Sequence, residues 1–188
     1  MNTIVGIGDC RVESRRDITL ITYALGSCVA VVVHDPIARV GGLLHFMLPE
    51  SNLDPDKAHQ NPYLFADTGI PLLFRSAYDL GADRRRMHIT LAGGAQMMEV
   101  DDHFNIGRRN CLAVRSILAQ AGFMAQTEAL AGSVSRTVRL HVSTGRVFLR
   151  ENGGLEHAIV PMACHEPIRK SCEPVLASMV TRDTSQKA

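Results

Sequence analysis

Residues 25–36 read LGSCVAVVVHDP, and residues 41–49 read GGLLHFMLP. The first segment opens with small residues, places Cys28 at the start of an apolar run and ends in an Asp-Pro pair, while the second is an apolar run that carries His45. This pattern predicts an antiparallel β-hairpin with Cys28 and His45 within a few residues of opposite each other. Directly opposed Cβ atoms lie about 5 Å apart, and a bulge at the paired glycines 41–42 is expected to absorb the remaining offset.

A cysteine beside a histidine is typical of nucleophilic catalysis, because the imidazole increases the thiolate fraction. The Cys28 thiol is therefore expected to react at a lower pH than an ordinary cysteine. The turn at Gly26 and Ser27 could present backbone N–H groups to a developing oxyanion, since small residues allow a carbonyl to approach closely. The competing interpretation is a core cysteine and a hydrogen-bonded strand histidine, which is the more frequent situation for an arbitrary pair.

Outside this hairpin the chain reads as many strands and two helices, which predicts an α+β fold. The strands are expected at residues 3–12, 17–23, 86–91, from 123 onward, and in a hairpin over 138–149. The helices are expected at 66–80, capped by Asp67 or Thr68, and from Asn105 as the cap to 121. Residues 50–62 are expected to form a loop.

Length and composition favour one domain over residues 1–160, with a flexible C-terminal tail at 161–188. The formal net charge of +1 gives no reason to expect a nucleic acid partner, and the arginines at 84–86 are read as a solvated edge. Neither a signal peptide nor a membrane span is recognisable, and the five cysteines are scattered and odd in number. A cytoplasmic protein without a disulfide framework is expected.

No cofactor or metal is expected. Cys164 and His165 with Cys172 lack the second close pair that zinc sites usually show. Gly93, Gly94 and Gly132 are not followed by the residues of a phosphate loop, so these glycines are read as tight turns.

The segment 25–30, the Asp35-Pro36 pair and the segment 45–49 together resemble the signature of the CheD family of chemoreceptor glutamine deamidases. Further matching motifs follow in the same order: Tyr63 with Ala66-Asp67-Thr68, Ala92-Gly93-Gly94-Ala95, Asn105-Ile106-Gly107 with Asn110, and Ser143-Thr144-Gly145-Arg146. The resemblance covers about residues 4 to 150. One departure is Ala129-Leu130-Ala131-Gly132, where the family often has Asp-x-Gly-Gly before its arginine, here Arg136.

The resemblance implies hydrolysis of the side-chain amide of particular glutamines on the cytoplasmic helices of methyl-accepting chemoreceptors, in chemotaxis adaptation. It also implies that Cys28 is the nucleophile, His45 its base and Thr22 the third member of a triad. A shallow, exposed site would suit such a bulky substrate. The family resemblance further implies a β-rich, sandwich-like core of mixed sheets flanked by two main helices, similar to the catalytic domain of cytotoxic necrotizing factor toxins.

Alternatives remain open at this point. Many CheD proteins bind a CheC-type phosphatase, and a non-catalytic adaptor for receptors or for that phosphatase is the second function considered. A different thiol amidohydrolase or protease is the third, although the sequence lacks the local context of papain-like enzymes.

Overall fold

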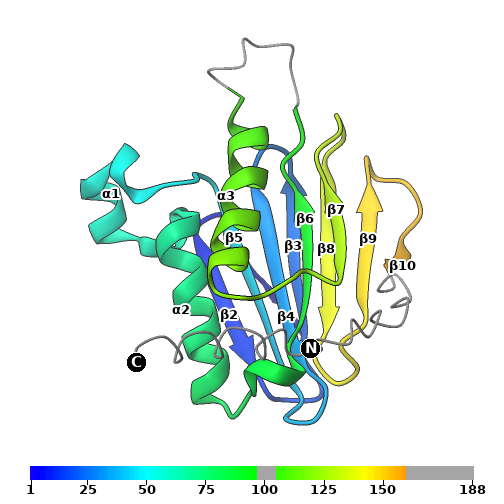
Figure 1. Cartoon of the computed structure of the whole chain (residues 1–188). Helices are drawn as coiled ribbons and strands as arrows, with labels where there is room; N and C mark the ends of the chain where they lie inside the picture. Colours follow the sequence, from blue (N-terminus) through cyan, green and yellow to red (C-terminus); the bar gives the residue numbers. More distant parts are fainter. Residues whose placement is uncertain (97–104, 160–188) are drawn as a thin grey trace, which may run out of the picture.

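The computed structural model describes residues 1–96 and 105–159, in which two five-stranded sheets stack face to face and helices cover one of them (Figure 1). The outer sheet has the order β1-β3-β8-β9-β10, with bounds Asn2–Ile4, Thr19–Leu25, Arg136–His141, Val147–Glu151 and His157–Ile159. The central sheet has the order β2-β5-β4-β6-β7, with bounds Asp9–Glu13, Val40–Phe46, Val29–Asp35, His88–Gly93 and Thr127–Leu130. Each sheet contains one parallel pair, β1 with β3 and β6 with β7, so the α+β prediction with mixed sheets is confirmed.

The predicted hairpin is the pair β4 and β5, and it lies in the middle of the central sheet. Every residue of both strands is buried. Val31 and Val33 face a core shared with the helices, whereas Ala30 and Val32 face a second core shared with the outer sheet. A strand covered on both faces reads as a continuous apolar run, which explains the sequence of β4.

The expected bulge at Gly41 and Gly42 is wrong, because the β4–β5 pairing keeps a regular register through both residues. Close packing explains these glycines instead. A Cβ atom on Gly42 would lie 2.8 Å from Leu73 Cδ1, and one on Gly41 would lie 3.0 Å from Leu140 Cδ2. The two layers on either side of β5 therefore leave no room for a side chain there.

The helices that cover the central sheet are α2 Ala66–Asp79 and α3 Ile106–Gln120, and Asn105 caps α3 as predicted. The cap prediction for α2 is wrong, since Phe65 takes that position without a side-chain hydrogen bond. Asp67 instead accepts hydrogen bonds from Ser51, and Thr68 Oγ1 donates to Pro62 O. Both side chains fold back onto the preceding segment.

That preceding segment is not the predicted loop. It contains three short helical elements, η1 Ser51–Leu53, α1 Pro55–Gln60 and η2 Pro62–Leu64. Asp54 accepts a hydrogen bond from Lys57 N and Asn61 accepts one from Tyr63 N, each just before a proline. A capping side chain followed by proline is a helix start, because proline has no N–H to satisfy.

The predicted strand over residues 3–12 divides into β1 and β2, which belong to different sheets. Val5 N still donates to Ile21 O of the outer sheet, whereas Gly8 N donates to His45 O of the central sheet. The glycines at 6 and 8 therefore mark a crossing between layers. The proposed tail at 161–188, together with Cys164, His165 and Cys172, lies outside the described residues.

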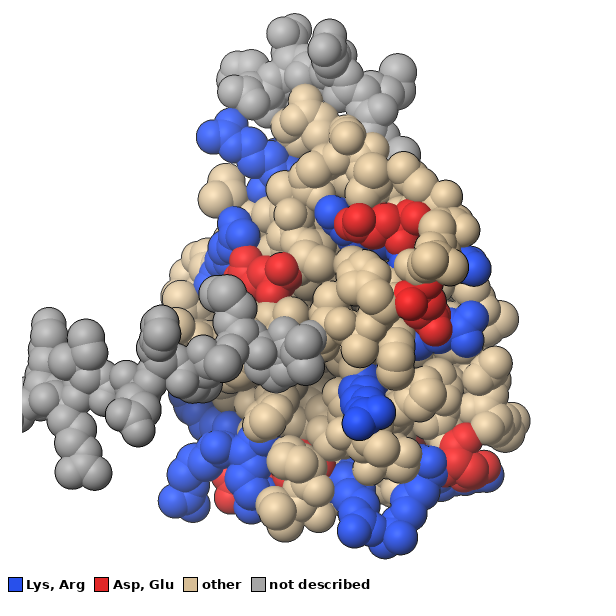
Figure 2. All heavy atoms as spheres, turned by 90° about the vertical axis from the view of Figure 1, so that its right-hand side faces the viewer, with Lys and Arg blue, Asp and Glu red and all other residues tan. Residues whose placement is uncertain are grey.

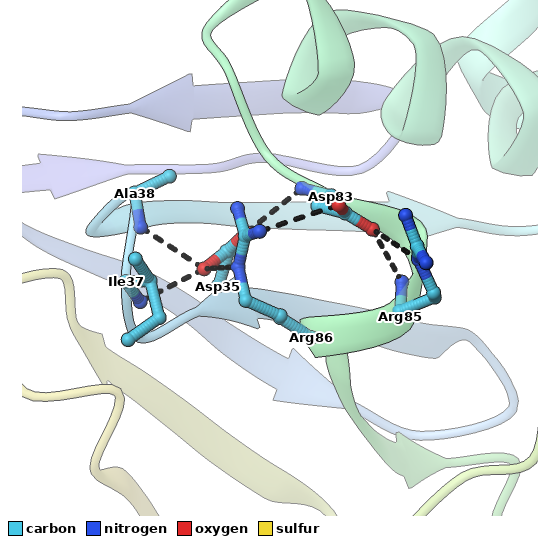
Figure 3. Close-up of polar contacts among 6 residues, drawn as sticks. All are labelled: Asp35, Ile37, Ala38, Asp83, Arg85 and Arg86. Carbon is cyan, nitrogen blue, oxygen red and sulfur yellow. Dashed lines mark hydrogen bonds and ion pairs between the residues drawn. The ribbon is translucent and has the colours of Figure 1, made fainter.

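The β4–β5 turn is held by the buried carboxylate of Asp35 (Figure 3). Asp35 accepts hydrogen bonds from the backbone N–H groups of Ile37, Ala38 and Asp83, and it pairs with the Arg86 guanidinium at 2.8 Å. Arg86 belongs to η3 Arg84–Arg86. On the face shown in Figure 2, Lys and Arg side chains gather at the lower end of the molecule. These arginines lie between α2 and β6, as the solvated-edge prediction has them, but Arg86 is half-buried and also pairs with Asp35.

Candidate active site

The hairpin register brings Cys28 and His45 onto the same face of the central sheet. His45 pairs with Ala30, and Cys28 immediately precedes β4, two residues before Ala30. Because side chains alternate along a strand, Cys28 lies on the face of Ala30, and both contribute to the core between the two sheets. The thiol is thus the diagonal neighbour of His45, a position within reach of side-chain contact.

Thr22 meets His45 from the other sheet. The distance from Thr22 Oγ1 to His45 Nδ1 is 2.8 Å, and the two side chains are 0% and 1% exposed. The other ring nitrogen, Nε2, is buried and has no hydrogen-bond partner, so no hydrogen bond joins it to Cys28 Sγ. When Nδ1–H donates to Thr22, Nε2 carries the lone pair and can accept a proton.

A β-bulge interrupts the pairing of β3 with β8 directly after Thr22. The register with β8 shifts between Thr22 and Leu25, and Ala24 has a left-handed backbone with φ of 55°. Such bulges re-aim the chain and are frequent beside functional sites. Here the bulge shifts the register, and β3 pairs once more with β8 at Leu25 before the chain enters the turn at Gly26.

Three consecutive carbonyl groups fix that turn. Gly26 O accepts from Ala95 N at 2.8 Å, Ser27 O from Asn110 Nδ2 at 2.9 Å, and Cys28 O from Gly94 N at 2.7 Å. Within residues 1–96 and 105–159, the N–H groups of Ser27 and Cys28 have no hydrogen-bond acceptor on another residue. The Cys28 N–H lies against its own thiol. The oxyanion turn stays a prediction, since it needs donors without a protein acceptor.

The prediction of tight turns at Gly93 and Gly94 missed their role in the close approach of β6 to the backbone of Cys28. Gly93 has φ of 111°, and a Cβ atom there would collide with Cys28 O. The glycine pair thus lets the end of β6 approach the backbone of Cys28. Two adjacent glycines directly after a strand were the available signal, because they often mark close backbone approach.

The departure at residues 129–132 also borders this turn. Ala131 adopts a left-handed φ of 65°, its N–H donates to Gly93 O at 2.9 Å, and its carbonyl accepts from Arg136 Nη1 at 2.7 Å. Arg136 is buried and also pairs with Glu151 at 3.0 Å. Residues 129–132 therefore hold Gly93 in place through a hydrogen bond. At the position with positive φ the chain has Ala131, although glycine or asparagine adopts that conformation more easily.

The expectation of a shallow, open site needs correction. Cys28 is only 9% exposed, so the nucleophile candidate is a buried residue and not part of an open surface. Two surface cavities of about 840 and 440 Å³ border α3, and neither is lined by Cys28, His45 or Thr22. In the described ranges no group of three or more His, Cys, Asp or Glu side chains could hold a metal ion. Those ranges also contain no helix with both the length and the apolar character needed to cross a bilayer.

Burial sets the protonation states of the pair. It raises the pKa of the Cys28 thiol above its ordinary value and lowers the pKa of His45 to about 4. The expected low thiol pKa is therefore wrong for the free protein. At neutral pH the site therefore holds a neutral thiol and a neutral imidazole. A neutral imidazole has a lone pair that can accept a proton.

Because His45 is buried in its neutral form, the free energy of unfolding should fall as the pH is lowered. The pKa of His45 is about 4 when folded and near its ordinary 6.5 when unfolded, so the unfolded chain binds more protons between these values. The contribution is fully present above pH 6.5 and is lost toward pH 4, up to about 3 kcal/mol. The free energy of unfolding, measured with urea across this pH range, should change less with pH for His45→Gln than for the natural chain. An equal pH dependence in the two proteins would contradict a neutral, buried imidazole.

Comparisons with known proteins agree with the resemblance seen in the sequence. The family model described as CheD chemotactic sensory transduction matches residues 47–151. The chain is also 51% identical over 150 residues to the probable chemoreceptor glutamine deamidase CheD of Solibacter usitatus, covering 80% of this chain and 89% of that relative. The chain belongs to the CheD family.

Other CheD proteins align over similar lengths. The probable chemoreceptor glutamine deamidase CheD 1 of Syntrophus aciditrophicus is 46% identical, with 81% of this chain and 96% of the relative covered. The chemoreceptor glutamine deamidase CheD of Thermotoga maritima is 37% identical, with 83% and 96% covered. The CheD family model begins at residue 47, so Thr22, Cys28 and His45 lie before the matched range.

Proposed function

We propose that this chain is a chemoreceptor glutamine deamidase that acts in chemotaxis adaptation, with Cys28 as nucleophile, His45 as base and Thr22 as the residue that orients the imidazole. The observation that carries the proposal is the buried Thr22–His45 hydrogen bond, which leaves Nε2 unpartnered on the face shared with Cys28. A histidine held through Nδ1 with Nε2 free is arranged as in other catalytic triads. The names of the CheD relatives supply the substrate class.

The first half-reaction follows from the residue types. As the thiol attacks the glutamine carboxamide carbon, its proton passes to His45 Nε2 and a C–S bond forms. The oxyanion of the tetrahedral intermediate accepts hydrogen bonds from the N–H groups of Ser27 and Cys28. The intermediate then collapses, the C–N bond breaks, and the His45 imidazolium gives its proton to the nitrogen, which leaves as ammonia.

The second half-reaction hydrolyses the thioester. His45 Nε2 takes a proton from water as the water oxygen attacks the thioester carbon, and the C–S bond then breaks while the His45 imidazolium returns that proton to the leaving Cys28 sulfur. Glutamate and the free thiol result. Thr22 is a hydroxyl and cannot compensate the imidazolium charge as a carboxylate does, which is consistent with a base that is neutral at rest.

The organisation of the chain enters the same proposal. We assign residues 1–160 to one catalytic domain, supported by the two cores that share the central sheet. The cytoplasm as location follows from the proposed substrate. A CheC-type phosphatase as partner, and a relationship to the cytotoxic necrotizing factor fold, stay predictions of the family resemblance.

The decisive experiment uses receptor cytoplasmic fragments from the same organism in water enriched in ¹⁸O. Mass spectrometry should find particular glutamines converted to glutamates that carry one ¹⁸O, since hydrolysis takes its oxygen from water. A fragment that binds the protein without any conversion would instead support the adaptor. Conversion at random glutamines, matched by a sample without protein, would count against the deamidase.

A further inference from the structure

Asn110 is a buried polar residue in a helix that otherwise presents apolar side chains to the central sheet. It lies in the second turn of α3 and is 0% exposed, and Val114, one turn later, belongs to the core beneath the helix. Its Oδ1 atom is buried without a hydrogen-bond partner. A buried asparagine with an unsatisfied acceptor is costly for folding, so its presence calls for a role.

The amide nitrogen of Asn110 joins the two strands of the catalytic hairpin. Nδ2 donates to Ser27 O at 2.9 Å and to Met47 O at 2.8 Å, so both of its hydrogens are used. Ser27 immediately precedes the nucleophile, and Met47 follows the base by two residues. The asparagine therefore spans the segments that carry the two reacting groups.

The two hydrogen bonds of Asn110 lie just beyond the end of the β4–β5 ladder. The last ladder pair between β4 and β5 is Val29 with Phe46, so no backbone pairing continues beyond it toward Ser27 and Met47. Asn110 supplies the next connection from a third element, α3. Without it, the carbonyl of Ser27 would lose its partner, while its neighbours keep theirs from Ala95 and Gly94.

We propose that Asn110 is a positioning residue that sets the separation between the Cys28 turn and the end of the His45 strand. It fixes the distance from the thiol to His45 Nε2 and the direction of the N–H groups of Ser27 and Cys28. This inference deepens the proposed function and rests on it for the catalytic readout. The accessibility of Cys28 tests it independently of any glutamine substrate.

The first test compares Asn110→Ala with Val114→Ala, a substitution one turn later in α3 that also removes buried contacts to the same sheet. In Asn110→Ala we expect kcat to fall roughly 10- to 100-fold with KM changed less than about 3-fold, because small misplacements of reacting groups are costly. Val114→Ala should lower thermal stability and leave kcat within about 3-fold of the natural chain.

The second readout is alkylation of Cys28 by iodoacetamide under native conditions, followed by peptide mass spectrometry. Releasing the turn should make the 9% exposed thiol more accessible, so alkylation should accelerate by roughly 10-fold in Asn110→Ala while kcat falls. Alkylation and kcat that both match Val114→Ala would overturn the proposal. If the natural chain deamidates nothing, the alkylation result still decides the role of Asn110.

Asn110→Asp keeps the shape of the side chain and serves if the alanine variant does not fold. An ionised carboxylate cannot donate to Ser27 O and Met47 O, whereas a protonated one can donate once. The ratio of variant to natural kcat should therefore rise as pH is lowered through the pKa of the new carboxyl. A ratio that does not change between about pH 9 and pH 5 would contradict the bridge.

Discussion

Replacing Cys28 with alanine is expected to lower the rate of glutamine deamidation at least about 10⁴-fold, because among residues 1–96 and 105–159 Cys28 is the only cysteine in the core between the two sheets, where His45 lies. The fold should survive, since Cys28 lies at the margin of the inter-sheet core and its removal leaves a small gap. Conversion of receptor fragments by equal amounts of folded protein, followed by mass spectrometry, measures the effect.

Cys10→Ala is the matched control for that experiment. Cys10 lies in β2, where it pairs with Leu44 and packs against the core on the helix side of the sheet. Burial raises its pKa to about 12, so it is an inert thiol. Its loss should leave the rate within about 3-fold of the natural chain. A Cys28→Ala protein that keeps a tenth of the natural rate would contradict the nucleophile assignment.

The sequence predicts the hairpin well because its pattern is local. An apolar run, an Asp-Pro turn and a returning run specify β4 and β5, and with the register they bring Cys28 and His45 onto one face. Helices α2 and α3 follow from their apolar spacing and from Gly81 and Gly122 beyond their ends. What the pattern cannot give is packing, so Gly41 and Gly42 were predicted to form a bulge where the structure has regular strand.

The site shows the same division between local pattern and tertiary packing. The 2.8 Å contact between Thr22 and His45 joins two different sheets, and only the stacking of those sheets creates it. The protonation states depend on burial, which reversed the expected pKa of Cys28. The sequence shows Asn110 as part of a CheD-like motif but not what it contacts, because its partners lie 83 and 63 residues away in the chain.

The largest expected loss of stability comes from the other end of β4. Asp35→Ala should lower the free energy of unfolding by about 2 to 4 kcal/mol, because three backbone N–H groups lose their acceptor and Arg86 keeps only its 3.3 Å pair with Asp83. Asp35 is 0% exposed, and Figure 3 shows these donors around its carboxylate. Urea unfolding at neutral pH measures the loss, and Asp17→Ala, which removes only an exposed pair with Arg15, should cost less than about 1 kcal/mol.

The pH dependence of that loss identifies its cause. Burial alone would raise the pKa of Asp35, but Arg86 and the N–H groups of Asp83, Ala38 and Ile37 hold it well below its ordinary value. The carboxylate therefore contributes stability above the unfolded pKa of 3.8, and this contribution is lost as pH falls below that value. The unfolding free energies of the natural chain and of Asp35→Asn should accordingly converge in acid. A constant gap would mean that shape, and not charge, matters at this turn.

The same substitution separates stability from chemistry. β4 spans seven residues from Val29 to Asp35, which places the turn roughly 20 Å from the Cys28 thiol. Asp35→Asn should therefore lower the unfolding temperature while kcat per folded molecule, measured well below that temperature, stays within about 3-fold of the natural value. A fall in kcat as large as that expected for Asn110→Ala would mean that the strand transmits strain from its turn to the nucleophile.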